Sequence, residues 1–284
     1  MSTFVAPQGT MISDPRAVLA SLERTAQKRF GQHFLARQDI VDAIVRTAGV
    51  RPGDKVVEVG PGLGILTASL VAAGAEVLAL ELDGALLDHL HRAVPGARVV
   101  HADATRAVWP ELCAGSGWKL VANLPYNVGT GILMDAVRQP GTFCQATVML
   151  QAEVIDRLAA PAGSDDFAAL SVHLQARAAP WIAIEVPPSA FVPPPKVHSR
   201  VMRVDVFPTP QTGDAAPADF DRTVTAAFAQ RRKMLRNTLK AAFGAERADA
   251  ALEAAGIPGT HRAESLDLDG FRRLAAALFP RANA

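Results

Sequence analysis

The chain has 284 residues, of which 49% are hydrophobic and 20% charged, and this describes a soluble globular protein slightly too long for a single hydrophobic core. Its 29 Lys and Arg residues nearly balance 28 Asp and Glu, so the formal net charge of +1 indicates neither a nucleic-acid binder nor a strongly acidic protein. Any charged function must therefore come from uneven placement of these residues.

The cysteine content and the hydropathy exclude several classes of protein. Cys113 and Cys144 have neither metal-ligand spacing nor a disulfide framework, which fits a reducing compartment and argues against a structural zinc. The longest uncharged stretch, 59–75, is interrupted by four glycines and a proline and cannot form a membrane span. The first residues show neither a secretory nor an amphipathic leader, so we expect a cytoplasmic protein.

From residue 55 onward, short β-branched apolar runs alternate with stretches of helical spacing. Five such strands between helices predict an α/β fold with a doubly wound, largely parallel, Rossmann-like sheet. The predicted strands are 55–59, 76–80, 97–100, 119–122 and 146–150.

The pattern changes after residue 180. Two alternating runs, 181–186 and 201–206, are joined by a proline-rich stretch and predict a closing antiparallel pair. Residues 208–217 have linker composition, and the remainder is helical in pattern. We therefore expect a catalytic domain over 1–210 and a small all-helical domain over 211–284.

Glycines follow the first predicted strand at Gly60, Gly62 and Gly64, where they allow a sharp turn and a close approach of a ligand to the backbone. The G-x-G-x-G spacing differs from the dinucleotide-binding G-x-G-x-x-G pattern, so a nucleoside without phosphates fits better than a pyrophosphate. Taken alone, this signal is weak.

Acidic residues end the second and third predicted strands. Glu81 lies about twenty residues beyond Gly60, where such folds hold the two ribose hydroxyls with one acceptor. Asp103 could accept from an adenine amino group while a neighbouring backbone N–H meets the ring. For either residue alone, an acid at the start of a helix is the more frequent explanation. Because candidate ligand-binding residues follow three successive strands, namely the glycine turn, Glu81 and Asp103, we favour ligand binding over that explanation.

The fourth predicted strand ends in Asn123-Leu124-Pro125-Tyr126, which favours a methyltransferase over a dehydrogenase. An adenine amine is a poor nucleophile, and the Asn123 side-chain oxygen with the Leu124 carbonyl could hold its two hydrogens. Pro125 helps aim that carbonyl, and Tyr126 offers a face on which an extruded base stacks. No general base is needed, since the nitrogen becomes acidic only as it takes the methyl group. A turn with an aromatic plug is the alternative interpretation.

Two further features concern the substrate. In the proline-rich loop, Phe191 could cover the second face of the base and Lys196 could meet a phosphate, although a rigid connection with a buried Phe is equally consistent. Two basic segments without acids suggest a phosphate track beside the adenine pocket, although a solvated charged face is the usual explanation of either one. On a helix, Arg232, Arg236 and Lys240 would share one face. The segments contain Lys28, Arg29 and Arg37, and Arg231, Arg232, Lys233, Arg236 and Lys240.

These motifs, in this order, resemble the S-adenosylmethionine-dependent ribosomal RNA adenine N6,N6-dimethyltransferases, and specifically their small-subunit branch. The resemblance covers nearly the whole chain and is far more specific than any one motif. The matching stretches are KRFGQHFL from Lys28, EVGPGLGILT from Glu58, ELD from Glu81, DA from Asp103, NLPYN from Asn123, FVPPPKV from Phe191, QRRK from Gln230, and Arg236-Asn237.

The resemblance implies a class I methyltransferase domain, S-adenosylmethionine as the cofactor, no metal and a monomer. It also implies the substrate: two adjacent adenines in the loop of the 3′-terminal hairpin of 16S RNA, each methylated twice within the immature small subunit. Loop adenines are already partly unstacked, which makes their extrusion cheap. The implied cofactor contacts are His33, Leu35, Gly60, Glu81, Asp103 and Asn123, with Gln32, Gly62, Leu82 and Ala104 beside them.

Departures from the family pattern are small. His198 stands where the family usually has Asp, which could weaken a polar contact in the loop after Phe191, and Phe167-Ala168 replaces a common Tyr-Gly. His33 stands where the family uses Asn or His.

Other functions remain open at this stage. The nearest is an antibiotic-resistance methyltransferase of large-subunit RNA, which shares the Asn-x-Pro-Tyr core but normally lacks the QRRK segment. A non-catalytic RNA-binding assembly factor and a nicotinamide oxidoreductase are further alternatives, the latter disfavoured by the glycine spacing. His89 and His91 are two apart on a predicted helix and cannot share a face, so they predict no metal.

Overall fold

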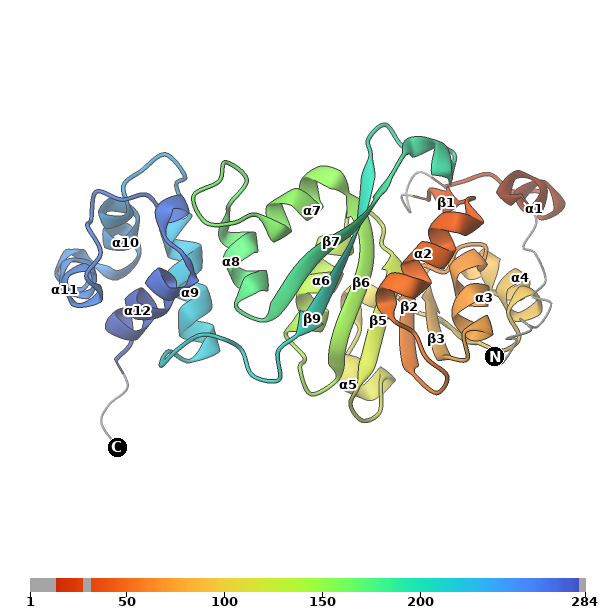
Figure 1. Ribbon diagram of the computed structural model, residues 1–284, viewed down its shortest axis with the longest axis horizontal. Helices are drawn as coiled ribbons and strands as arrows, with labels where there is room; N and C mark the ends of the chain where they lie inside the picture. The colour runs from red at the N-terminus through yellow and green to blue at the C-terminus, as the bar shows by residue number, and fades with distance from the viewer. Residues whose placement is uncertain (1–13, 28–31, 281–284) are drawn as a thin grey trace, which may run out of the picture. The chain divides into compact units, whose positions relative to one another are not determined.

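A computed structural model describes residues 14–27 and 32–280 of the chain (Figure 1). Its contacts divide into two units, each described here by itself. The first combines Met1–Ile155 with Trp181–Pro208, and the second combines Asp156–Pro180 with Thr209–Ala284.

The first unit is built on a seven-stranded sheet of order β4-β3-β2-β5-β6-β9-β7. The five strands predicted to be parallel are parallel, and β2 lies between β3 and β5 as in a doubly wound sheet. Their burial on both faces explains why they appear in the sequence as nearly continuous apolar runs. These strands are β2 (Lys55–Val59), β3 (Glu76–Glu81), β4 (Arg98–His101), β5 (Trp118–Asn123) and β6 (Phe143–Gln151).

The last strands close one edge of this sheet. β9 (Ser199–Val206) pairs antiparallel with β6, with Met149 opposite Val201, and its other neighbour is β7 (Ala178–Val186). The two alternating runs are therefore adjacent as predicted. β9 also contributes to the core, because Val201 and Val204 are fully buried.

Helices cover the sheet, with α2 and α3 passing in front of it in Figure 1. Ile44 on α2 and Leu70 on α3 pack with Val56 and Val121, which point to that face, while Val57 is buried toward the opposite face. Two layers of helices around a parallel sheet leave its carboxyl edge as the place for a ligand. The helices of this part are α2 (Gln38–Ala48), α3 (Ile65–Ala72), α4 (Leu87–Ala93), α5 (Trp109–Leu112) and α6 (Gly129–Val137).

A short ribbon joins the beginning of the first unit to its end. β1 (Phe34–Leu35) pairs antiparallel with β8 (Phe191–Val192), so that Leu35 faces Phe191. Before this ribbon, α1 (Pro15–Ser21) places Val18 and Leu19 in a small cluster with Leu86 and Leu90. α1 is thus packed against α4, while β1 itself pairs with β8.

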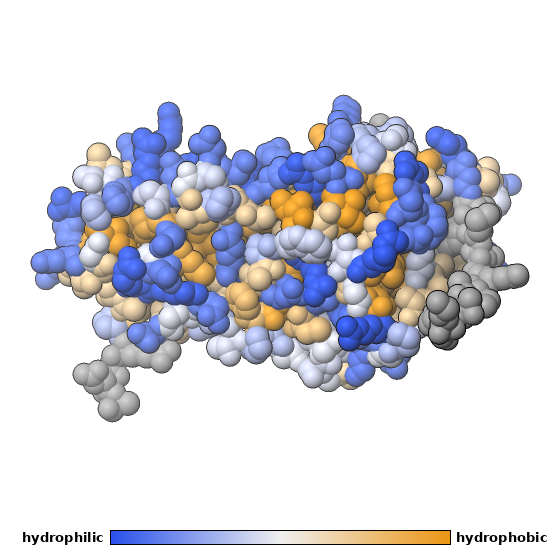
Figure 2. Space-filling view, in the orientation of Figure 1, coloured by the Kyte–Doolittle hydropathy of each residue, from blue (hydrophilic) through white to orange (hydrophobic). Residues whose placement is uncertain are grey.

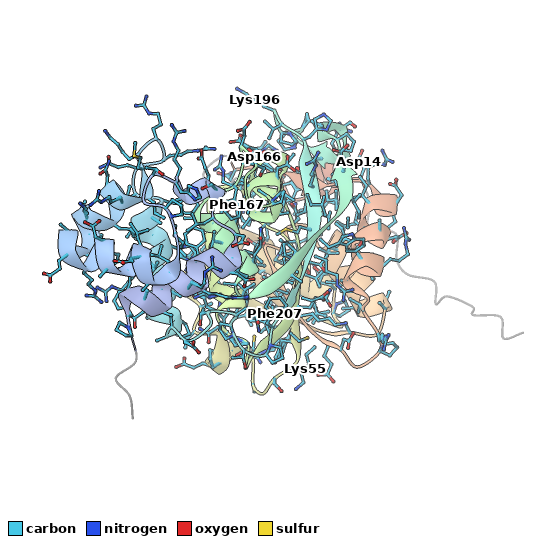
Figure 3. The ribbon with its side chains drawn as sticks, turned by 60° about the vertical axis from the view of Figure 1, so that its left-hand side comes forward. Asp14, Lys55, Asp166, Phe167, Lys196 and Phe207 are labelled. Atoms are coloured by element: carbon cyan, nitrogen blue, oxygen red, sulfur yellow. The ribbon has the colours of Figure 1, made fainter. Side chains whose placement is uncertain are left out.

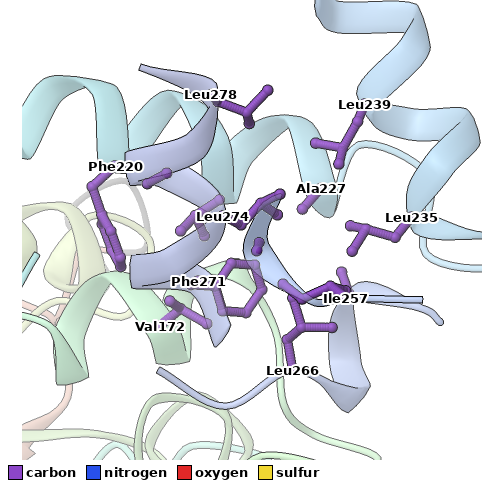
Figure 4. Packing of buried hydrophobic residues seen from close by; sticks show 14 of the residues in the cluster. Val172, Phe220, Ala227, Leu235, Leu239, Ile257, Leu266, Phe271, Leu274 and Leu278 are labelled. Atoms are coloured by element: carbon purple, nitrogen blue, oxygen red, sulfur yellow. The ribbon is translucent and has the colours of Figure 1, made fainter. Parts of the chain in front are cut away.

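The second unit is a helical bundle around the ring of Phe271 (Figure 4). Leu235, Leu239 and Leu274, all fully buried, surround it together with Val172. Its helices are α8 (Ala169–Gln175), α9 (Pro217–Ala227), α10 (Leu235–Phe243), α11 (Ala245–Ala255) and α12 (Leu268–Leu278), and α7 spans Ala152–Ala159.

The structure divides the chain differently from the prediction, which placed a single domain boundary near residue 210. Residues 156–180 pack with the C-terminal helices, because Phe167 and Val172 are apolar side chains that enter their core. A buried ion pair strengthens this packing: Arg177, 3% exposed, donates to Asp221 on α9 at 2.7 Å, and His173 contacts the same carboxylate at 2.9 Å.

The face seen in Figure 2 mixes hydrophilic side chains with small apolar areas. Such a surface is normal for short helices that bury one stripe. Within the residues that the structure describes, no helix is both long and apolar enough to cross a membrane.

Candidate active site

The carboxyl ends of β2, β3, β4 and β5 surround a cavity of about 240 Å³ in the first unit. Every residue predicted to contact the cofactor borders it, and so does the Asn-Leu-Pro-Tyr turn. Sequence positions more than ninety residues apart, such as Gln32 and Tyr126, are thereby brought to one place. The predicted residues around the cavity are Gln32, His33, Leu35, Gly60, Gly62, Glu81, Leu82, Asp103, Ala104, Asn123, Leu124, Pro125 and Tyr126.

The glycine turn after β2 requires its glycines. Gly60, Gly62 and Gly64 have φ of +70°, +57° and +88°, a region that other residues rarely adopt. At Gly62 a Cβ atom would lie 2.9 Å from the ring of Phe34, so the turn also allows β1 to approach. The backbone of the turn therefore forms part of the cavity wall.

Glu81 is held at the end of β3 with both carboxylate oxygens occupied. The Gly62 N–H donates to one at 3.1 Å and the Asp83 N–H to the other at 2.8 Å. Its side chain is buried, and this burial raises its pKa although the two N–H groups oppose the shift. These bonds fix the orientation of a carboxylate whose remaining lone pairs can accept from hydroxyl groups.

Asp103 stands at the start of a short helix and also borders the cavity. It caps a short 3₁₀-helix, Ala104–Arg106, by accepting from the Thr105 N–H at 2.9 Å and from its hydroxyl at 2.6 Å. These bonds lower the pKa of Asp103, so its carboxylate is charged at neutral pH. The acid at a helix start is thus also a charged acceptor at the cavity.

Glu58, in the middle of the first strand motif, borders the same cavity, and it was not among the predicted contacts. Its side chain is 2% exposed, and its Oε2 has no hydrogen-bond partner among the described residues. Burial, with a smaller contribution from the Glu81 charge, raises the pKa of Glu58 to about 8. An acidic residue in an otherwise apolar central strand is the signal that could have identified it.

Asn123 is oriented by the strand that lies across the cavity. Its Nδ2 donates to the His33 carbonyl at 3.3 Å, so the side-chain oxygen remains available to accept a hydrogen bond. The turn that follows is closed by the Gly129 N–H, which donates to the Pro125 carbonyl at 2.7 Å. Leu124 anchors the turn with a side chain that is 1% exposed.

Tyr126 is fixed by two contacts. Its ring stacks on that of His33, with centroids 5.8 Å apart and an angle of 24° between the planes. Its hydroxyl lies 2.7 Å from the hydroxyl of Ser199, which is fully buried, and burial raises the Tyr126 pKa. His33 in turn contacts the Pro193 carbonyl at 2.8 Å through Nδ1. Polar and aromatic contacts therefore set the direction of the Tyr126 ring.

A polar network holds the chain segment before β1 beside β3. Asp83, directly after the strand, accepts from the Gln32 amide at 3.1 Å and pairs with Arg24 at 3.4 Å. The Gln32 side-chain oxygen accepts from the Gln27 N–H at 2.8 Å. Gln32 thus supports the cavity wall through Asp83.

Phe191 does not reach this cavity, contrary to the proposed contact with a base. It is 2% exposed, pairs with Leu35 in the β1–β8 ribbon and packs in the core with Ile40 and Val201. Burial of the Phe191 ring in this apolar site is more favourable than its exposure to solvent. The alternative of a rigid connection with a buried Phe is the arrangement found.

The basic residues divide into three groups. Lys28 and Arg29 lie outside the described residues. Lys196 is exposed in the loop between β8 and β9, where Figure 3 labels it. Arg231, Arg232 and Lys233 are exposed, but they precede α10 instead of lying on it, so Arg232 does not continue a helical face.

Several of these cations are paired. Arg236 contacts Asp249 of α11 at 2.6 Å, and Lys240 contacts the same carboxylate at 3.2 Å. Arg231 pairs with Glu264 at 3.4 Å and donates to the Asp165 carbonyl. The basic segment 231–240 contains no acid, but Asp249 of α11 offsets part of its positive charge.

Within residues 14–27 and 32–280, no group of three or more His, Cys, Asp and Glu side chains could hold a metal ion.

Comparison with known proteins agrees with this geometry. A family model described as ribosomal RNA adenine dimethylase matches residues 23–278. The ribosomal RNA small subunit methyltransferase A of Phenylobacterium zucineum is 43% identical over 91% of this chain and 90% of its own length. The protein of that name from Syntrophotalea carbinolica is 40% identical over 89% of this chain and 97% of its own.

Solved structures have the same fold. A dimethyladenosine transferase from Plasmodium falciparum superposes with a TM-score of 0.71 and 22% identity, covering 85% of this chain and 96% of its own. The 23S rRNA methyltransferase ErmE gives a TM-score of 0.67 and 26% identity over 86% and 99%. The sheet, the cavity at its carboxyl edge and the family match agree, and the chain belongs to the ribosomal RNA adenine dimethylase family.

Proposed function

We propose that the protein transfers methyl groups from S-adenosylmethionine to N6 of two adjacent adenines in the 3′-terminal hairpin loop of small-subunit ribosomal RNA, forming N6,N6-dimethyladenosines. The substrate would be the immature small subunit, and the enzyme would act as a cytoplasmic monomer. The observation that carries the proposal is the Asn123 side chain, whose amide donates to His33 so that its oxygen is available beside Tyr126.

The residues of the cavity fit S-adenosylmethionine. Glu81 would accept from the ribose hydroxyls and Asp103 from the adenine amino group. The buried, unpartnered Oε2 of Glu58 offers an acceptor to a cationic group, which a neutral nucleoside would lack. When bound, the cofactor supplies a methyl group activated by its sulfonium sulfur. The protein's part is to hold it and to exclude water.

The target amine would be held at the Asn-Leu-Pro-Tyr turn. The Asn123 oxygen and the Leu124 carbonyl would accept its two N–H groups, which favours a nitrogen with its lone pair directed out of the ring plane. Tyr126 would stack on the extruded base, a contact worth about 1–3 kcal/mol. Positioning and fixed dipoles then account for the catalysis, and the proton leaves after the nitrogen has become cationic.

RNA contact is proposed for the cations that are exposed. Arg232, Lys233 and Lys196 would meet phosphates, and Arg231 and Arg236 could do so in addition to their protein partners. Phosphate contacts of this kind position RNA without reading its sequence. Lys196 belongs to the first unit and the other four residues belong to the second, helical unit, which is proposed as the RNA-binding one.

The test is transfer of labelled methyl groups to immature small subunits that lack the modification, with naked small-subunit RNA and large subunits as parallel substrates. Digestion to nucleosides should give N6,N6-dimethyladenosine from the small subunits. Label in large-subunit RNA instead would support the antibiotic-resistance alternative, and no label with any substrate would support a non-catalytic assembly factor. Glu81→Ala should abolish cofactor binding in calorimetry and serves as the inactive control.

A further inference from the structure

Glu58 is a buried carboxyl group that the catalytic arrangement above does not explain fully. It lies on β2, next to the glycine turn, and borders the cavity although it is 2% exposed. Among the described residues, neither its Oε2 nor the fully buried hydroxyl of Thr67 on α3 has a hydrogen-bond partner. Unpaired buried polar atoms are costly and rare, so a group like this calls for an occupant.

Acids lie around Glu58, but no lysine or arginine does among the described residues that line the cavity. Glu81 and Asp103 at the ends of the neighbouring strands, His33 before β1 and Tyr126 after β5 are the other titratable groups around the cavity. Neither lysine nor arginine occurs among the described residues that line it. A carboxylate at Glu58 would therefore face the negative charge of Glu81 without a compensating cation.

Hydrogen bonding decides which of the two glutamates keeps its charge. Glu81 accepts two backbone N–H groups, which stabilise the ionised form, whereas Glu58 accepts none. Burial, with the Glu81 charge as a smaller cause, raises the pKa of Glu58 to about 8, and the nearby Thr67 hydroxyl only partly opposes this. A pKa of about 8 keeps Glu58 mostly protonated at pH 7, whereas the two N–H donors of Glu81 favour its charged form.

We propose that Glu58 carries a proton in the free protein and releases it when the cationic end of the methyl donor enters the cavity. This inference rests on the proposed function, because S-adenosylmethionine provides that end through its sulfonium and ammonium groups. The O–H bond of the carboxyl group breaks, the electron pair stays on the carboxylate beside the cation, and the proton passes to the buffer. The burial of the acid keeps the Glu58 carboxyl group itself neutral until a cation arrives.

Because proton release is coupled to donor binding, the number of protons released and the pH dependence of affinity can both be measured. At pH 7 a group with its pKa near 8 is mostly protonated, so binding should release about one proton per donor. Affinity should then rise by up to about tenfold per pH unit from pH 6 toward pH 8 and level off above it. A nucleoside that lacks the cationic end should show neither effect.

The experiment is titration calorimetry of the full chain at pH 7 in two buffers of different ionisation enthalpy, phosphate and Tris. S-adenosylmethionine is the probe, and methylthioadenosine, which has the same nucleoside but a neutral thioether, is the matched ligand control. Glu58→Gln, which imitates the protonated acid in shape, should bind the donor without releasing a proton. His33→Asn should leave the release unchanged, which excludes the imidazole as its source.

Equal binding heats of the wild-type protein in both buffers would overturn the proposal, whatever the variants do. Release of the same proton by Glu58→Gln would overturn it as well, as would an equal release with methylthioadenosine. Failure of the proposed function gives a different result, namely no binding of S-adenosylmethionine in either buffer. Circular dichroism of Glu58→Gln confirms that the variant is folded before its heats are compared.

Discussion

Tyr126 is the residue whose replacement should separate target binding from cofactor binding. Its ring is set by stacking on His33 at 5.8 Å and by the hydroxyl contact with Ser199 at 2.7 Å. Tyr126→Ala removes the whole stacking surface, whereas Tyr126→Phe keeps the ring and removes only the contact with the buried Ser199 hydroxyl. Tyr126→Ala therefore measures the contribution of the stacking surface, and Tyr126→Phe measures the contribution of the hydroxyl contact that orients the ring.

The expected magnitudes follow from these contacts. Loss of a stacked base costs about 1–3 kcal/mol, which is roughly a 5- to 150-fold decrease of kcat/KM for Tyr126→Ala. Loss of one hydrogen bond between neutral groups, with Ser199 left unpaired, costs about 1 kcal/mol, or roughly fivefold, for Tyr126→Phe. Because the Glu81 and Asp103 contacts are unaffected, the affinity for the donor should change much less than turnover.

Single-turnover methylation of small subunits measures these rates, and calorimetry with S-adenosylmethionine measures the affinity. Ser199→Ala and the double variant Tyr126→Phe/Ser199→Ala complete a cycle in which the double variant should be little worse than either single one. Turnover of Tyr126→Ala within about twofold of wild type would refute the stacking role. An equal loss of donor affinity and turnover would instead make the tyrosine part of the cofactor site.

Three further predictions concern stability, the glycine turn and RNA. Asp221→Ala should lower the free energy of unfolding by about 3 kcal/mol in urea, since it leaves the buried Arg177 guanidinium unpaired, whereas Asp249→Ala breaks a solvent-exposed pair and should barely shift the midpoint. Gly62→Ala should weaken donor binding at least tenfold in calorimetry, because its φ is +57° and its Cβ would meet an aromatic ring. Arg232→Glu should lower affinity for small-subunit RNA and reduce the salt dependence of binding, by about one unit of slope in gel-shift titrations.

The Asp221 pair also predicts a pH dependence. Burial raises the pKa of this carboxyl, but its bonds to His173 and Arg177 outweigh that effect and leave the pKa lowered. Its contribution to stability is therefore complete above the pKa of an aspartate in the unfolded chain, about 4, and is lost as the pH falls through the lower folded value. An Asp221→Ala variant that is as stable as wild type at pH 7, or Arg232→Glu with unchanged salt dependence, would contradict these expectations. So would full donor affinity in Gly62→Ala.

Strand patterns could be predicted because they depend on local burial. The apolar run of Lys55–Val59 and the acid at the end of Glu76–Glu81 identify central strands and their ligand-binding edge without knowledge of any partner. Parallel strands align their carboxyl ends, so Glu81, Asp103 and Asn123 had to meet once the sheet was predicted. Their meeting at one cavity confirms this reasoning.

Features that depend on contacts distant in sequence could not be predicted in this way. Phe191 appeared as a candidate for base contact until its pairing with Leu35 placed it in the core. The cations Arg236 and Lys240 appeared free of acids because Asp249 comes from the next helix. Composition around residues 156–180 gave no sign that Phe167 would pack with the C-terminal helices.

The β1–β8 ribbon has a consequence for synthesis of the protein. His33 contacts Pro193, Leu35 pairs with Phe191, and Tyr126 depends on Ser199 for its orientation. Both sides of the cavity are therefore completed by a segment made about 160 residues after β1. A nascent chain can form the central strands early, but it has no finished donor site until residues 191–199 have left the ribosome that is making them.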